Sequence, residues 1–326
     1  MIFRTEIQLP PPPVAISLSS EIISIGSCFA DAMGRRLAQL KLPVTKNPFG
    51  VIYNPISILS LINTCLQNPE HGFEAAGYLE REGYWYHDQM HTSIHADSKI
   101  ALQKMLSSLT KDISQALKTA HWLIITPGTA HVYLYKENDR LVANCHKLPG
   151  KSFKRHMLTI SEITSMFATT YQLLKKLNPG LKILLTVSPV RHIKDTLQVN
   201  AVSKSTLLLA ANQLQQTFED VHYFPSYEIM LDDLRDYRFY QRDMIHPSDE
   251  AEDYIWSRFS DTYFTDELKA FEKQWTKISK SLSHRPFMQH SEKHQAFLRK
   301  ILTQLENLAH KIDVEDEIQL VKQQMI

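Results

Sequence analysis

Two side chains that can act as nucleophiles, Ser27 and Cys28, stand next to each other where an apolar run ends. The run, EIISI at 21–25, has the β-branched residues of a buried strand, and Gly26 follows it. A helical pattern then begins, with apolar residues on one face at Phe29, Met33, Leu37 and Leu40. The start of a helix offers unpaired N–H groups and a positive dipole end, which favour an anion. The turn can therefore present a nucleophile whose own N–H helps to hold an oxyanion.

Both residues of the pair also have a purely structural interpretation. A helix N-terminus favours the thiolate form of a cysteine, whereas a serine in the same place still needs a general base. Alternatively, Ser27 caps the helix and Cys28 is a small buried apolar residue. The turn alone leaves these interpretations open, and a nucleophile of either kind needs a base.

The best-placed base among the 15 histidines is His246. It follows Asp243 by three residues, in a loop just before a predicted helix that starts near Pro247. Within one turn of loop, the Asp243 carboxylate can accept the Nδ1–H of the imidazole, which leaves Nε2 free to act as a base. The alternative is that Asp243 caps a turn and His246 is a surface residue.

Glycines and polar residues follow the other predicted strands. Gly50 comes after a short candidate strand at 42–46, where its N–H can donate to an oxyanion. Past the strands predicted at 121–126 and 181–187 come further candidates for oxyanion or substrate binding: Gly128, Thr129, His131, Arg191 and His192. In open parallel sheets, ligands bind outside the carboxyl ends of the strands. The convergence of these residues on one edge of the sheet is stronger evidence for a functional site there than any one residue alone.

The segment HDQMHTSIH spaces His87, His91 and His95 four residues apart. On a helix these histidines would share a face and could bind zinc. Thr92, Ser93 and Ile94 make a regular helix doubtful at this place, so a loop that contributes a histidine or two to the pocket is the stronger interpretation. We therefore expect no metal and no cofactor.

Short apolar runs alternate with helical patterns along most of the chain. The strand candidates lie at 21–25, 42–46, 121–126, 181–187 and 221–225, and the helical patterns at 161–177 and 203–220. This alternation predicts a mostly parallel sheet with helices on both faces. Two hairpins are expected to interrupt it, at 78–87 with a turn at Glu82-Gly83 and at 131–146 with a turn around Asn138-Asp139. We expect a proline-rich lead-in over 1–20, an α/β domain over 21–264 and a helical extension over 265–326.

Composition narrows the class of protein. The 36 basic and 35 acidic residues give a net charge of +1, so no global field favours nucleic acid or an anionic membrane. The chain has three cysteines, a small and odd number that argues against a disulfide framework. Free thiols suit a reducing cytoplasm. No signal peptide and no apolar run of about 20 residues is evident. A cytoplasmic protein is expected.

Six ordered motifs resemble the GSCFA-domain family. They cover roughly residues 20–260 and read GSCFA (26–30), NPFG-x-x-YNP (47–55), GTA-x-VY (128–133), NCHK (144–147), SPVRH (188–192) and DYRFY-x-x-DM-x-HP (236–247). That family is grouped with the SGNH hydrolases, α/β/α enzymes that cleave or transfer acyl esters. The resemblance implies a three-layer α/β/α sandwich, SGNH-hydrolase or flavodoxin-like, with a mostly parallel five-stranded sheet and a C-terminal helical appendage.

The sequence departs from the superfamily pattern of a Gly-Asp-Ser turn, a glycine, a Gly-x-Asn and an Asp-x-x-His. Gly50 resembles the second block, and Asp243 with His246 resembles the last. When Gly26-Ser27-Cys28 is laid over Gly-Asp-Ser, Cys28 takes the nucleophile position. In addition, GTAH has no asparagine where a third oxyanion donor belongs, although Thr129, His131 or two backbone N–H groups can substitute. The loss of one donor can cost about two to three orders of magnitude in rate.

The resemblance implies an acyl-ester hydrolase or an O-acyltransferase that acts on an acylated carbohydrate or an acyl thioester. Cys28 would attack, His246 would move protons and Asp243 would orient the imidazole, with Ser27 as the competing nucleophile. The alternative is an inactive module that binds a glycan or an acyl group. The helical extension can also mediate self-association of the chain.

Overall fold

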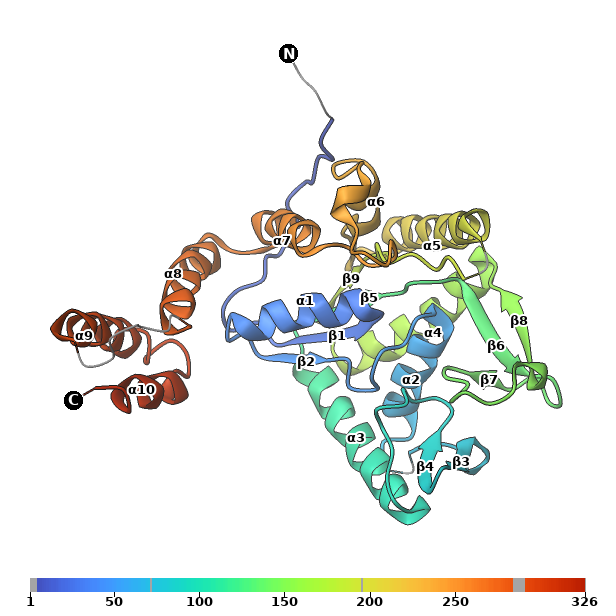
Figure 1. Ribbon diagram of the computed structural model, residues 1–326. Helices are drawn as coiled ribbons and strands as arrows, with labels where there is room; N and C mark the ends of the chain where they lie inside the picture. Colours follow the sequence, from blue (N-terminus) through green and yellow to red (C-terminus); the bar gives the residue numbers. More distant parts are fainter. Residues whose placement is uncertain (1–4, 71, 195, 284–290, 326) are drawn as a thin grey trace.

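The computed structural model describes residues 5–70, 72–194, 196–283 and 291–325 (Figure 1). Residues 1–4 of the expected proline-rich lead-in lie outside the described residues. A parallel sheet of five strands forms the centre, in the spatial order β10 (Val221–Tyr223), β9 (Lys182–Leu185), β5 (Trp122–Thr126), β1 (Ile22–Gly26) and β2 (Val44–Lys46). The predicted five-stranded parallel sheet is confirmed, and each strand falls within one residue of an apolar run seen in the sequence.

The two central strands are buried on both faces, and their side chains alternate between two cores. Every residue of β1 and β5 is buried. Ile22 and Trp122 belong to one hydrophobic cluster, whereas their neighbours Ile23 and Leu123 belong to the other. Because successive side chains of a strand point to opposite faces, a continuous apolar run is what a doubly covered sheet requires.

Helices cover both faces of the sheet, which completes the α/β/α sandwich (Figure 1). On one face lie α1 (Cys28–Gln39), α6 (Ser226–Leu231) and α7 (Asp249–Tyr263). Against the other face pack α2 (Pro55–Gln67), α3 (Lys99–Thr119), α4 (Ile160–Leu177) and part of α5 (Leu197–Thr217). The sequence analysis predicted α4 and α5 but not α2 or α3. Only Gln67 of α2 is exposed, and polar residues such as Ser57 and Asn63 lie among its buried positions, so its sequence shows no clear helical period.

Small antiparallel sheets lie beside this core. β3 (Tyr78–Arg81) and β4 (Tyr84–His87) form the first predicted hairpin, and Glu82 and Gly83 take positive φ values of 53° and 80° at its turn. In the second, β6 (His131–Tyr135) pairs with β7 (Leu141–Val142) and also with β8 (Phe153–Met157), which the sequence analysis did not predict. Short 3₁₀ turns occur at η1 (Ala75–Gly77), η2 (Gly150–Ser152) and η3 (Tyr237–Phe239).

The expected C-terminal helices are present as α8 (Asp266–Leu282), α9 (Glu292–Glu306) and α10 (Glu315–Lys322), which lie together at one end of the molecule (Figure 1). Their buried apolar residues belong to the same cluster as those of α1 and α7. The Trp275 indole donates to the Gln39 carbonyl at 2.6 Å, and Lys41 pairs with Glu317 at 2.7 Å. Within the described ranges, no helix combines the length and the apolar character that a membrane crossing needs.

Candidate functional site

The turn between β1 and α1 has one residue that must be glycine. A Cβ atom on Gly26 would lie 2.3 Å from the Thr126 carbonyl oxygen on the neighbouring strand. The next residue, Ser27, donates its N–H to the same carbonyl at 3.0 Å. The Ser27 hydroxyl accepts the N–H of Phe29 at 3.3 Å, and the residue is only 1% exposed. Ser27 is therefore the N-cap of α1, and its expected alternative role as nucleophile is not supported because its hydroxyl is buried and engaged.

Cys28 is the first residue of α1 and is half-buried. As the first helical residue, it has no intrahelical acceptor for its N–H. Its Sγ lies 3.7 Å from the hydroxyl of Tyr53, close enough for a hydrogen bond to sulfur. Burial, reinforced by the neighbouring thiol, raises the pKa of Tyr53 above its ordinary value, so the phenol stays protonated and can donate. The sequence analysis missed Tyr53, although it lies within the NPFG-x-x-YNP motif.

The loop at 47–53 is hydrogen-bonded to the turn between β1 and α1. The Asn47 side chain accepts the Gly26 N–H at 2.9 Å, and the Ile52 N–H donates to the Gly26 carbonyl at 2.9 Å. The Gly50 N–H donates to the Asn47 carbonyl at 2.8 Å. Gly50 was expected to supply an oxyanion donor, but this hydrogen bond already uses its N–H. A glycine is needed at position 50 for another reason, because a Cβ atom there would lie 2.2 Å from the Cβ of His91.

The GTAH segment after β5 is likewise engaged in holding the loops together. The N–H groups of Gly128 and Thr129 both donate to the Tyr53 carbonyl, at 2.7 and 3.2 Å. The Thr129 hydroxyl lies 3.1 Å from that of Ser203 on α5 and also accepts the His131 N–H at 3.2 Å. The expected direct roles of Gly128 and Thr129 as oxyanion donors are therefore not supported. Both residues instead fix the backbone on which Tyr53 stands, and His131 begins β6.

Arg191 and His192 both follow β9, but their side chains contact different residues. An added Cβ on Gly128 would lie 2.9 Å from Nε2 of His192, so the imidazole rests on this glycine. The same ring meets Tyr53 edge-on at 5.6 Å between centroids. The Arg191 guanidinium instead lies over the Tyr240 ring, 3.8 Å from its centroid. His192 therefore belongs to one cluster with Cys28 and Tyr53, whereas Arg191 packs on Tyr240.

Asp243 and His246 form the hydrogen bond that their spacing predicted. Nδ1 of His246 lies 2.7 Å from one carboxylate oxygen of Asp243. The other oxygen accepts the N–H groups of Ile245 and His246, at 2.8 and 3.0 Å. The His246 bond, followed by these two backbone bonds, lowers the pKa of Asp243 to about 2. The carboxylate is thus charged and holds the imidazole with Nε2 turned away from it, as a general base requires.

The loop that carries His246 is attached to the strand-end cluster through its backbone. The Arg191 N–H donates to the Ile245 carbonyl at 3.1 Å. Behind it, α1 and α7 share a hydrophobic cluster and an ion pair of 2.6 Å between Arg36 and Asp253. Within the described chain, Cys28 and His246 form no direct hydrogen bond; the thiol faces Tyr53. Proton transfer between them therefore requires a bridging water or closure of this loop.

The three evenly spaced histidines do not lie on a helix. His87 ends β4 in a buried position, and His91 and His95 follow in turns. The His91 N–H donates to the Phe49 carbonyl at 3.0 Å, so this segment supports the loop at 47–53. No group of three or more His, Cys, Asp or Glu side chains in the described residues is arranged to hold a metal ion. The zinc interpretation of this segment therefore has no support in the structure.

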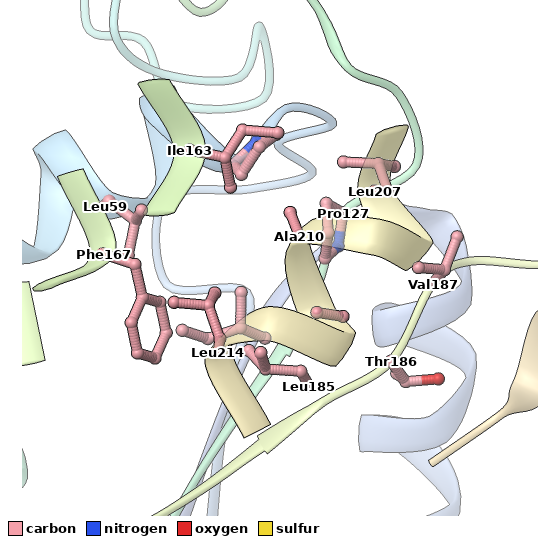
Figure 2. A pocket seen from close by; sticks show the side chains of 13 residues that line it. Leu59, Pro127, Ile163, Phe167, Leu185, Thr186, Val187, Leu207, Ala210 and Leu214 are labelled. Atoms are coloured by element: carbon pink, nitrogen blue, oxygen red, sulfur yellow. The ribbon is translucent and has the colours of Figure 1, made fainter. Parts of the chain in front are cut away.

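A small apolar cavity lies beneath the strand ends (Figure 2). Its volume is about 30 Å³, and residues such as Pro127, Phe167, Val187 and Leu207 line it. A cavity of this size holds at most about two water molecules. It is too small for an acyl group, so it is a packing gap under the site.

Two family profiles match the sequence, and together they cover most of the chain. The sequence profile described as the GSCFA family matches residues 21–259. A second profile, described as the C-terminal domain of GSCFA domain proteins, matches residues 275–326. No curated protein matches the chain. Because the first profile spans well over half of the sequence, from the strand before Cys28 through the loop of His246, the chain belongs to the GSCFA family.

Proposed function

We propose that this protein catalyses acyl transfer through a covalent acyl-enzyme on Cys28, as an ester hydrolase or an O-acyltransferase. The observation that carries the proposal is the 2.7 Å hydrogen bond between Asp243 and His246, in a loop whose Ile245 carbonyl accepts the N–H of Arg191 from the segment after β9. A site that only binds has no need of an imidazole held in one tautomer. The substrate would be an acylated carbohydrate or an acyl thioester.

The chemistry would proceed in two steps. The Cys28 sulfur attacks the acyl carbonyl while its proton passes to Nε2 of His246, through water or after closure of the loop. The Cys28 N–H and the Tyr53 hydroxyl hold the oxyanion of the tetrahedral intermediate. When it collapses, the leaving group takes the proton from His246 and departs. Water or an acceptor hydroxyl then attacks the thioester, with His246 again removing the proton, and the free thiol is regenerated.

Thioester donors suit this site better than simple esters. Transfer of an acyl group between two sulfur atoms is close to balanced in energy, and a thiolate leaving group needs little protonation. The engaged N–H groups of Gly50 and Gly128 leave fewer oxyanion donors than a full SGNH site has. Fewer donors slow the hydrolysis of unactivated esters most.

The same shortage of donors favours a second candidate, an inactive module that recognises a glycan or an acyl group without turnover. The two candidates differ in one consequence, because only the enzyme forms a covalent intermediate. The oriented imidazole of His246 favours the enzyme.

Intact-mass spectrometry of the full chain after incubation with a panel of acyl esters and acyl thioesters tests the proposal. We expect a mass increase equal to one acyl group, located at Cys28 by peptide mapping and absent from Cys28→Ala. The double variant Cys28→Ala/His246→Ala is expected to be little worse in turnover than either single variant, because the two groups act as a unit. The absence of an adduct and of turnover with every donor, in protein shown to be folded, would leave the binding module.

A further inference from the structure

Arg191 occupies a defined position next to the loop of His246. Its guanidinium lies 3.8 Å from the centroid of the Tyr240 ring and 5.2 Å from that of Tyr237. Its backbone N–H donates to the Ile245 carbonyl, one residue before His246. Contact with the two aromatic rings restrains the position of the guanidinium. The arginine is thus preorganised rather than a mobile surface side chain.

This arginine has no acidic partner among the residues that the structure describes. The other arginine beside it, Arg235, is paired with Asp232 and is largely exposed. Asp236 also lies nearby, but its carboxylate accepts the Arg238 N–H at 2.9 Å as the cap of η3. Half-buried arginines usually have a carboxylate or phosphate within reach. Among the described residues, the charge of Arg191 is therefore left without an anionic group to bind.

A second cation without an acidic partner in the described chain lies behind it. Lys204, on α5, is 1% exposed, donates to the Ser188 carbonyl at 2.6 Å and lies 5.5 Å from the Tyr227 ring centroid. Arg191 acts on the same phenol, since it opposes the increase that burial causes in the pKa of Tyr227. Lys204 is too deeply buried to contact a ligand, and desolvation lowers its pKa to about 7, so Arg191 is the group that stays charged here above neutral pH.

There is also space for a ligand. A cavity of about 160 Å³ lies between α6 and η3, and Arg191, Tyr237 and Tyr240 line it together with the charged residues Arg235 and Asp236. Tyr237 is 63% exposed, so the cavity is reached from the surface. Its volume suits a small charged group with part of its carrier.

We propose that Arg191 binds an anionic oxygen group, a carboxylate or a phosphate, on the substrate that acylates Cys28. The inference rests on the proposed function, because it names the substrate class of that same site. The group has two sources, since the negative charge can belong to the acyl chain or to the carrier from which the acyl group leaves. A bidentate bond from the guanidinium fork serves both.

Acylation rates with four matched thioesters distinguish these sources. The acyl group is acetyl or succinyl, and the carrier is neutral N-acetylcysteamine or the phosphorylated carrier coenzyme A. The second-order rate of adduct formation at Cys28 is measured by intact mass for the full chain and for Arg191→Gln, Arg191→Lys and Arg238→Gln. Arg238 is the control because it is also a cation over an aromatic ring, 4.9 Å from the Phe239 centroid, but it is exposed and does not line this cavity.

We expect Arg191→Gln to lower the acylation rate about 10- to 100-fold for the thioesters whose acyl group or carrier, whichever Arg191 binds, is negatively charged. This is the range for a lost charge-assisted hydrogen bond. The rate of Arg191→Gln with uncharged acetyl-N-acetylcysteamine should stay within about twofold of that of the unmodified protein. Arg191→Lys should lose less rate with the charged thioesters than Arg191→Gln does, and Arg238→Gln should match the unmodified protein with all four. A preference for succinyl places the charge on the acyl group, and a preference for coenzyme A places it on the carrier.

Two results would overturn the inference while leaving the proposed function intact. The first is Cys28 acylation with no preference for any charged thioester. The second is an equal loss with neutral and charged thioesters in Arg191→Gln, which would make Arg191 only a support for the His246 loop. If no thioester acylates Cys28 in the unmodified protein, the proposed function itself fails. Thermal unfolding of each variant shows whether a loss comes from misfolding.

Discussion

At the scale of single residues, the two adjacent side chains at the turn have separate tasks. Ser27 is buried and caps α1, whereas Cys28 is half-buried and faces the hydroxyl of Tyr53. The difference follows from the geometry of a helix start. The N-cap side chain folds back onto the N–H groups of the first turn, and the residue after it points outward.

Replacing Ser27 by alanine should reduce stability and spare the chemistry. Loss of an N-cap costs about 0.5–2 kcal/mol of unfolding free energy. We expect that loss for Ser27→Ala in urea denaturation, together with a measurable rate of Cys28 acylation. If Ser27→Ala folds normally but is inactive while Cys28→Ala retains activity, then Ser27 is the nucleophile.

The three thiols should differ in their reactivity toward iodoacetamide at neutral pH. Burial raises the pKa of Cys65 to about 12 and also raises that of Cys145. Cys28 is half-buried at the first position of α1, where backbone N–H groups can stabilise negative charge that develops on the sulfur during alkylation. Peptide mapping over a time course should show Cys28 labelled first, and labelling of all three at one slow rate would mark Cys28 as structural.

The contact between Tyr53 and Cys28 predicts a loss of rate when the hydroxyl is removed. Tyr53→Phe keeps the ring against His192 but deletes one oxyanion donor, which costs about 10²- to 10³-fold in rate. Single-turnover acylation measures the effect, and Tyr133→Phe, a tyrosine 40% exposed on β6, is the control. A loss of less than threefold would remove Tyr53 from the catalytic group.

At the scale of elements, the beginning of α5 holds the two loops that follow β5 and β9. Asn200 accepts the His192 N–H at 2.8 Å, and Ser203 accepts the Ala130 N–H at 2.7 Å. Lys204 reaches the Ser188 carbonyl from the next position. Because these residues are one turn or less apart, a single rigid helix sets the spacing of both loops at the edge of the sheet.

The buried Lys204 makes stability depend on pH. Desolvation lowers its pKa to about 7 in the folded protein, against 10.5 when it is exposed on unfolding. Between these values the unfolded chain binds more protons, so the unfolding free energy rises with pH. From pH 7 to 9, we expect the unmodified protein to gain about 1–3 kcal/mol relative to Lys204→Met in urea unfolding.

The control for this measurement is Lys104→Met, at an exposed position of α3. This variant should keep the pH dependence of the unmodified protein. Parallel stability curves for the unmodified protein and Lys204→Met would show that the amine does not titrate in this range.

At the scale of the whole molecule, the C-terminal helices are part of the same core as the sheet domain. Trp275 is 4% exposed, packs on Phe271 and donates to the Gln39 carbonyl at the end of α1. Because α1 begins at Cys28, the far end of the helix that carries this residue packs on the extension. Self-association through these helices stays a prediction, which light scattering of the full chain tests.

Trp275→Ala should therefore destabilise the entire molecule rather than only its C-terminal helices. Truncation of a buried tryptophan costs about 3–5 kcal/mol of unfolding free energy. Denaturation followed by far-ultraviolet circular dichroism should show one transition shifted to lower urea, with Trp275→Phe losing much less. Separate transitions for the helices and the sheet would contradict the shared core.

The sequence by itself determined the sheet, the turn and the paired Asp243 and His246. Buried parallel strands leave continuous apolar runs, and a hydrogen bond across three residues is local, so both can be derived from neighbouring positions. α2 could not be identified in this way, because a helix buried nearly all round has no apolar stripe.

Only the tertiary structure decided which groups at the sheet edge are engaged and which remain available. The N–H groups of Gly50 and Gly128 bond to partners in the same or another loop, and Tyr53 meets Cys28 across 25 residues of sequence. That Arg191 and Lys204 have no acidic partner within the described part of the chain likewise becomes visible only once the loops are folded. Hydrogen bonding and burial depend on neighbours that are distant in the chain, and no pattern of residue types along the sequence records those neighbours.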